Sequence, residues 1–302
     1  MPTEPLQSIL YRDLSKAQAR PVIEVASGVL QELVNFASNA LVRCETSTKG
    51  QDNEDLVVLF LYRHIMEMTD GVEVLISQSS ATPGVPLIRS SFEALISMEY
   101  IVEDDAEYVM RSLAWLVDYL HQRLDLYESL DPSTSRGQEF QRALSQDKTV
   151  STIPVVAEDR VRQAVANLQD LLAKPQFAAI EKDFTELKGQ RAWYRLYGGP
   201  NDIRRLAHHV GRGAQYDFLY RQWCRVSHAH DFAPFFAKTL DGEAAIRGIR
   251  DPSDLKDVAN FAATFMLGAT RALIGKFRPG EDISTWYSRE VRPGYVQLYT
   301  RK

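Results

Sequence analysis

The chain has 302 residues, of which 45% are hydrophobic and 25% charged, so it is long enough to bury a core in one large domain or two small ones. Its net charge of -5 gives no overall attraction to nucleic acid and counts against a sequence-reading DNA-binding protein. The longest clean apolar run, Leu56 to Tyr62, is far shorter than the ~20 residues of a membrane span, and the first residues lack a secretion signal. We therefore expect a cytoplasmic protein without membrane insertion. Its two cysteines, Cys44 and Cys224, form no close pair and are expected to be buried free thiols.

Apolar residues recur at spacings of three and four along most of the chain, which predicts helices and almost no strands. Pro21 fits the first turn of a helix over 22–46, and Pro86 fits the start of another, because a first turn needs no N–H from its residues. The other predicted helices, in chain order, are 53–79, one from the break at 103–105 to about 130, a short one from 138, 156–172, 176–188, 203–210, 216–230 and 254–277. The predicted fold class is all-α, a multi-helix bundle forming a single large domain.

Two loops, 131–137 and 148–155, are candidate domain boundaries, but composition does not change across them. We therefore expect one domain with a loop insertion. Its predicted parts are an N-terminal helical segment over 1–50, the main helical bundle over 51–280, and an aromatic-rich tail over 281–302 that packs back on the surface.

The helix predicted over 216–230 carries hydrogen-bonding side chains where a core helix would carry Leu, Ile or Val. At ~100° per residue, one stripe of this helix holds Tyr216, Tyr220, Trp223, Ser227 and His230. Buried polar groups need partners, so the stripe must face another helix's charges, water or a ligand.

Arg89 and Glu93 can supply such partners, since they lie one turn apart on a helix whose other positions are mostly apolar. A charged pair in that setting is either a mutually satisfied structural bridge or the wall of a site, and both interpretations stay open here.

Three separated segments resemble a family of bacterial helical proteins of unknown function over about residues 55–240. They are Arg-Ser-x-x-Glu at 89–93, Trp193-Tyr194 before a glycine-rich turn, and Tyr-x3-Tyr-x6-Ser-x-x-His at 216–230. The resemblance implies an α-helical bundle with a shared polar cluster and no established activity. On this sequence the cluster would comprise Arg89, Glu93, Tyr216, Tyr220, Ser227 and His230.

Two further matches, Arg225-x4-His230 and Arg221-x6-His228, are similar to the motif of HEPN nucleases, whose domains are helical bundles. The resemblance implies a metal-independent ribonuclease acting as a homodimer. The histidine would be the general acid or base, and the arginine would stabilise the phosphorane charge. Val226 departs from the small polar residue that the motif prefers after arginine, whereas Gln222 is closer to it.

The sequence leaves several functions open. The first is a HEPN-like ribonuclease, or other phosphodiester-directed enzyme, of a bacterial defence or toxin-type system, with RNA or an antitoxin as partner and Glu93 among its catalytic residues. The alternative is a non-catalytic helical module that binds a small polar ligand or a protein partner. A third interpretation is a stability network. No metal-ligand spacing or cofactor motif is found, and arginines near the 216–230 helix could line a positive groove.

Overall fold

The described part of the chain is almost wholly helical, which confirms the predicted all-α bundle. The computed structural model describes residues 10–48, 53–147, 158–189, 191–227, 236–238, 241–246 and 249–300. Its longer helices are α1 (Arg12–Glu45), α2 (Asn53–Ser77), α3 (Val85–Val102), α4 (Tyr108–Leu130), α5 (Ser135–Gln146), α6 (Glu158–Leu172), α7 (Pro175–Thr185), α11 (Leu255–Phe277) and α13 (Arg292–Thr300). Shorter helical elements are η1 (Thr82–Gly84), η3 (Trp193–Gly198), α8 (Ile203–His209), α9 (Gly213–Gln215), η4 (Tyr216–Tyr220), α10 (Arg221–Ser227), α12 (Ser284–Trp286) and η6 (Tyr287–Val291). A hairpin of β1 (Phe236–Lys238) and β2 (Ala244–Ile246) is antiparallel.

Two compact units make up the chain. The first combines the residues up to Glu103 with those from Arg204 onward, and the second is Asp104–Ile203. In the second unit α4 packs against α5, α6, α7 and η3. The second unit contains the predicted helices 156–172 and 176–188, and both candidate boundaries, 131–137 and 148–155, lie inside it rather than at its ends. The predicted parts 1–50, 51–280 and 281–302 stay a prediction.

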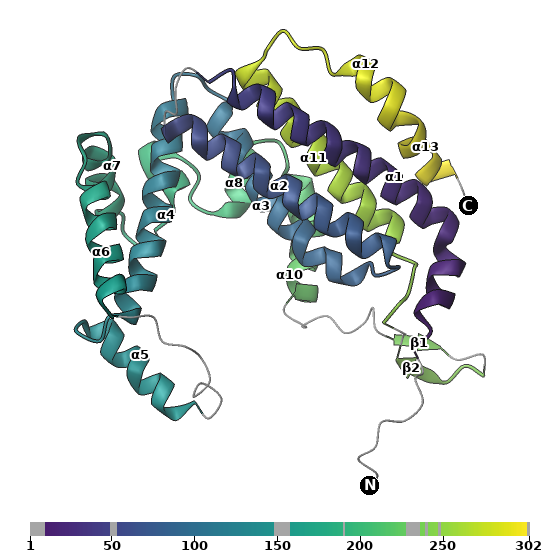
Figure 1. Cartoon of the computed structure of the whole chain (residues 1–302), viewed down its shortest axis with the longest axis horizontal. Helices are drawn as coiled ribbons and strands as arrows, with labels where there is room; N and C mark the ends of the chain where they lie inside the picture. The colour runs from purple at the N-terminus through teal and green to yellow at the C-terminus, as the bar shows by residue number, and fades with distance from the viewer. Residues whose placement is uncertain are drawn as a thin grey trace. The chain divides into compact units, whose positions relative to one another are not determined.

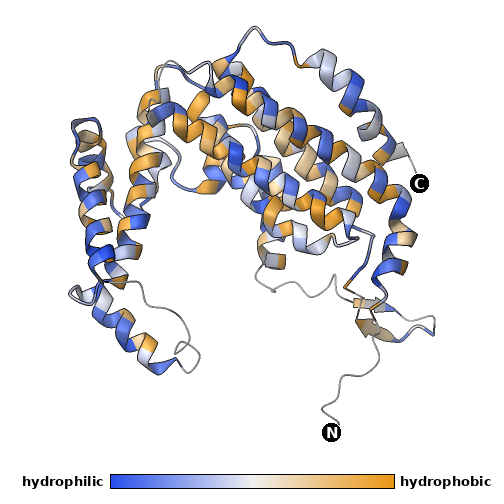
Figure 2. Cartoon of the chain, viewed as in Figure 1, coloured by the Kyte–Doolittle hydropathy of each residue, from blue (hydrophilic) through white to orange (hydrophobic). Residues whose placement is uncertain are grey.

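The core of the first unit lies around α11, which packs against α1, α2 and α3 (Figure 1). Figure 2 shows apolar residues along the adjoining faces of these four helices. Among the described residues, α11 alone is long and apolar enough to cross a membrane by length and composition, and 56% of its apolar window is buried in the bundle. This burial is what a core helix requires.

The first helix begins ten residues before the predicted start. Pro21 lies inside α1 rather than in its first turn. An internal proline removes one helical hydrogen bond and costs ~3 kcal/mol in a helix interior. Here Pro21 is exposed, so water can hydrate the carbonyl that its missing N–H leaves free. Burial of the α1 residues that follow, among them Ala26, Leu30 and Leu33, offsets that cost.

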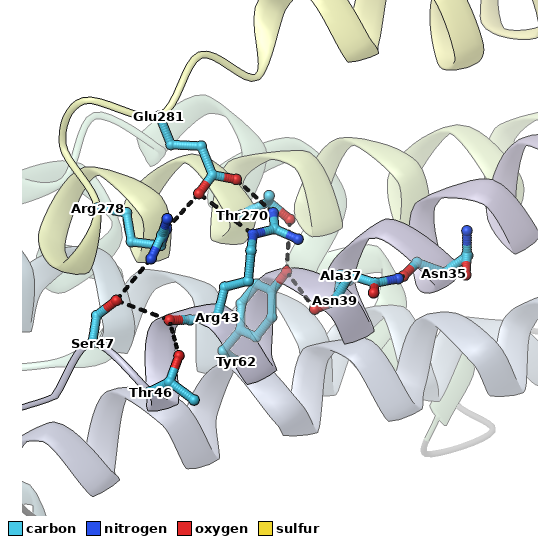
Figure 3. A network of polar contacts seen from close by, with 10 residues as sticks. All are labelled: Asn35, Ala37, Asn39, Arg43, Thr46, Ser47, Tyr62, Thr270, Arg278 and Glu281. Atoms are coloured by element: carbon cyan, nitrogen blue, oxygen red, sulfur yellow. Dashed lines mark hydrogen bonds and ion pairs between the residues drawn. The ribbon is translucent and has the colours of Figure 1, made fainter.

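The C-terminal segment packs on α1 through η6 and α13. Its Trp286 ring stacks on Phe36, with centroids 3.6 Å apart, and its indole N–H donates to Glu32 at 2.8 Å. Figure 3 shows the polar network at the C-terminal end of α1, where the Glu281 carboxylate accepts hydrogen bonds from both Arg43 and Arg278. These two guanidinium groups hold the pKa of Glu281 below its ordinary value.

The two thiols differ in environment. Cys44 is fully buried, and burial raises its pKa to about 11. Cys224 is only half-buried, so the prediction of two buried thiols is wrong for it. The reason is that α10 covers α3 from one side and leaves part of its own surface open to solvent.

Candidate functional site

The face of α3 that carries the charged pair is distinct from its core face. Phe92 and Leu95 are fully buried in the bundle. Arg89 and Glu93 lie one turn apart, with 28% and 38% of their side chains exposed and 3.1 Å between Arg89 Nε and Glu93 Oε1. The pair is therefore at the edge of the helix crossing, where solvent can reach it.

Tyr220 of the following helical region completes this cluster. Its hydroxyl donates to Glu93 Oε1 at 2.7 Å and accepts from Arg89 Nη2 at 3.3 Å. The guanidinium carbon lies 5.3 Å from the ring centroid of Tyr220, which is a cation–π distance. The predicted pairing of the tyrosine stripe with Arg89 and Glu93 is thus observed for Tyr220. We call Arg89, Glu93 and Tyr220 the α3 cluster.

Burial and neighbouring charges fix the protonation of Tyr220 and Arg89. Burial raises the pKa of Tyr220, and the neighbouring Glu93 carboxylate raises it further, so the phenol stays neutral and acts as a donor. Burial lowers the pKa of Arg89, but its contacts with Tyr220 and Glu93 outweigh this and leave the pKa raised. The cluster therefore presents one fixed cation and a carboxylate oriented by a neutral phenol.

A π-turn shapes the tyrosine stripe. Residues Gly213–Ser227 form one continuous helical stretch whose middle segment, η4, is π-helical. A π-turn accommodates one extra residue in an α-helix, and such turns recur at functional sites. Within this turn the Tyr216 ring stacks on Tyr220, with centroids 4.7 Å apart and planes 20° from parallel.

Asp217 anchors this π-turn to α8. Its carboxylate accepts two hydrogen bonds from Arg204, at 2.7 and 3.1 Å, and one from His208 at 2.9 Å. These contacts lower the pKa of Asp217 to about 2, with the Arg204 hydrogen bond as the largest cause.

Further polar pairs continue from the α3 cluster along α3. Arg212 makes a bidentate ion pair with Glu99, with 2.5 Å from Nε to Oε2 and 2.5 Å from Nη2 to Oε1. Nε2 of His209 lies 2.6 Å from Oε1 of Glu103. The chain from 209 to 220 therefore runs antiparallel to α3. Sequence reasoning missed these partners, although glutamates recurring in an otherwise apolar helix were the available signal.

Trp223 does not belong to the polar site. It is buried and packs edge-on against Phe92, Phe261 and Phe265, so this part of the predicted polar stripe is an aromatic core contact. Ser227 differs again, because its buried hydroxyl has no hydrogen-bond partner among the described residues. Arg89 Nε is also buried and makes no aligned hydrogen bond, despite its distance to Glu93.

Residues 55–243 match the model of DUF5677, a family of unknown function. The chain belongs to this family. No curated protein and no solved structure matches the chain. The DUF5677 segment contains the α3 cluster, Asp217 and the whole second unit, and it leaves out α1 and α11. The family resemblance inferred from the sequence is confirmed, whereas the HEPN resemblance stays a hypothesis.

The Arg–His motifs lie at the end of the DUF5677 segment. Arg221 is exposed on α10. His228 and His230 are outside the described residues, as is the Arg225 side chain. Two arginines expected in a positive groove, Arg204 and Arg212, are instead neutralised by carboxylates. Within the part of the chain that the structure describes, no group of three or more His, Cys, Asp or Glu side chains is arranged to hold a metal ion.

Proposed function

We propose that this DUF5677 chain is a helical module that binds a small polar ligand at the α3 cluster. The observation that carries the proposal is a charged pair kept about one-third exposed at a helix crossing and oriented by a buried phenol. A pair serving stability alone gains little at such exposure, because water competes for both charges.

The chemistry of the α3 cluster indicates the class of ligand. Arg89 offers donors and Glu93 offers acceptors on adjacent turns, and the two charges cancel. A ligand with both an acceptor and a donor, such as an amide or a zwitterion, complements this pattern. A polyanion does not, since Arg204 and Arg212 are already paired with carboxylates.

The test is a screen of small amides, amino acids and polyols by ligand-observed NMR against three proteins. Wild type should bind a member of the set, and Tyr220→Phe should weaken that binding at least tenfold, because the phenol no longer orients Glu93. Arg212→Lys is the matched control, since it alters an ion pair on the same helices away from the α3 cluster. Equal binding by wild type and Tyr220→Phe, or no binding at all, would refute the proposal.

A second candidate function is the HEPN-like ribonuclease. Arg221 favours it, because this exposed side chain makes no ion pair with the described residues and is available to phosphate. The catalytic base would be His228 or His230. The proposal includes RNA as substrate and a homodimer that brings two motifs together.

The ribonuclease is tested with RNA and EDTA. Wild type should cleave a mixed RNA pool, and a His228→Ala/His230→Ala variant with an unchanged melting temperature should not. Arg221→Gln should reduce the rate at least tenfold, while Arg63→Gln, at another exposed arginine, should leave it unchanged. Cleavage that survives loss of both histidines would rule this function out.

A further inference from the structure

A serine–histidine pair lies beside the α3 cluster and belongs to none of its contacts. Nε2 of His64 on α2 is 2.7 Å from Oγ of Ser90 on α3, and both residues are half-buried. This distance is within the range of an activated nucleophile and its base. We propose that Ser90 is a nucleophile for acyl groups and that His64 is its general base.

The hydrogen bonding of Ser90 differs from that of several other helical hydroxyls in this bundle. Ser91, Ser97 and Thr270 each donate to the carbonyl four residues earlier in their own helix, and so does Ser38. Such back-bonding occupies the hydroxyl proton. The partner of Ser90 is the imidazole of His64, and in the tautomer with the proton on Nδ1 the Ser90 hydroxyl donates to Nε2.

The Ser90–His64 pair is separate from the charges of the α3 cluster. Arg89 is the preceding residue on α3, and its guanidinium is held by Tyr220 and Glu93. Consecutive residues of a helix do not face each other, so Ser90 meets α2 while Arg89 meets Tyr220. The role of Ser90 therefore differs from ligand binding by the α3 cluster and does not depend on it.

The proposed reaction is hydrolysis of an activated ester. Ser90 Oγ forms a bond to the acyl carbon while His64, with its proton on Nδ1, takes the hydroxyl proton on Nε2. The tetrahedral intermediate expels the alkoxide, which receives that proton from His64. Water then attacks the acyl-serine with His64 again as base, and the products are a carboxylic acid and free Ser90.

A fluorophosphonate probe tests the nucleophile without a known substrate. Attack of Ser90 Oγ on phosphorus forms the O–P bond and expels fluoride, which leaves a stable adduct. Intact mass and peptide mapping of wild type should give one adduct on Ser90. Ser90→Ala should give none, and His64→Gln should react about 10²-fold or more slowly, the range expected for loss of a general base. Ser97→Ala, on the same helix, should react as wild type.

Melting temperatures of all four proteins separate a reactive-site effect from unfolding. Hydrolysis of p-nitrophenyl acetate provides a second readout and should fall in the same two variants. Absence of the adduct in wild type, an adduct on another residue, or equal rates for wild type and folded His64→Gln would each overturn the proposal.

Discussion

At the scale of single residues, the candidate site depends on one hydroxyl group. Tyr220 links η4 to both charged residues of α3, with a donated bond to Glu93 and an accepted bond from Arg89. The sequence could predict that the tyrosine stripe faces Arg89 and Glu93, because polar groups at core spacing need polar partners. It could not predict that Trp223 turns to the aromatic core, since an indole satisfies either environment.

Replacing Arg89 with alanine tests whether the α3 cluster is a stability network. Glu93 is 38% exposed and keeps its bond from Tyr220, so water and the phenol can solvate it. We expect Arg89→Ala to lower the free energy of unfolding by ~1–2 kcal/mol in urea titrations. A loss of ~3–5 kcal/mol, the cost of stranding a buried charge, would instead support the purely structural interpretation.

Asp217 gives the site a defined response to acid. Its pKa is lowered from 3.8 to about 2 in the folded protein, so the unfolded chain takes up this proton first as the pH falls. The stabilisation is present above about pH 4 and is lost as the pH falls through about 2. Urea titrations should find wild type more stable than Asp217→Asn at pH 6, with the difference closing between pH 4 and pH 2. A constant difference across that range would contradict this assignment, and Arg204→Gln should narrow the difference at pH 6.

At the scale of elements, hydrophobic spacing predicted the positions of most helices, but it did not predict that the helix over 216–230 contains a π-helical turn. The 216–230 region was predicted as a plain α-helix, whereas η4 is a π-turn. The choice between α and π depends on tertiary contacts, here those of Asp217 with α8 and of Tyr220 with α3. Likewise, α1 extends through Pro21 because its packing in the bundle outweighs a local helix-breaking signal.

Two glycines of α11 provide a matched test of how this helix meets Arg212. A Cβ at Gly268 would lie 2.8 Å from Arg212 Nη2, whereas a Cβ at Gly275 meets nothing within 4 Å. Gly275→Ala should stabilise the protein by ~0.5–1 kcal/mol through helix propensity. Gly268→Ala should destabilise it by ~1 kcal/mol, because Arg212 must leave Glu99.

The Arg212→Ala background checks the cause of that difference. With the guanidinium absent, Gly268→Ala should become stabilising, like Gly275→Ala, in chemical denaturation. If Gly268→Ala stays destabilising there, the crowding comes from another neighbour, such as Leu95.

At the scale of the whole molecule, the DUF5677 segment and the folded units do not coincide. The segment includes α2 and α3, but it leaves out α1, which packs on α2, and α11, which packs on both. The all-helical fold and the family were predictable from the sequence. The two-unit division was not, because the second unit has the same composition as the first and interrupts it in sequence.

A fragment of residues 55–243 should therefore not fold as the full chain does. It would expose residues such as Ile65, Ile88 and Phe92, which are fully buried in the bundle. We expect reduced helicity by circular dichroism and no cooperative thermal transition. A fragment of residues 104–203, a compact unit by itself, is the comparison and should retain a cooperative transition. Cooperative unfolding of 55–243 would show that α1 and α11 are dispensable.

The π-turn has a consequence for insertions and deletions. Because η4 accommodates one residue more than an α-turn of equal span, a chain lacking one residue between 216 and 220 could close the same helix as a regular α-helix. Its fold and its contacts before Gly213 would persist. Residues on both sides of the deletion would keep their present faces, because the π-turn absorbs the one extra residue, and Tyr216 and Tyr220 would stand three residues apart instead of four. Within DUF5677, a difference of one residue in chain length across this turn would thus be compatible with the same bundle.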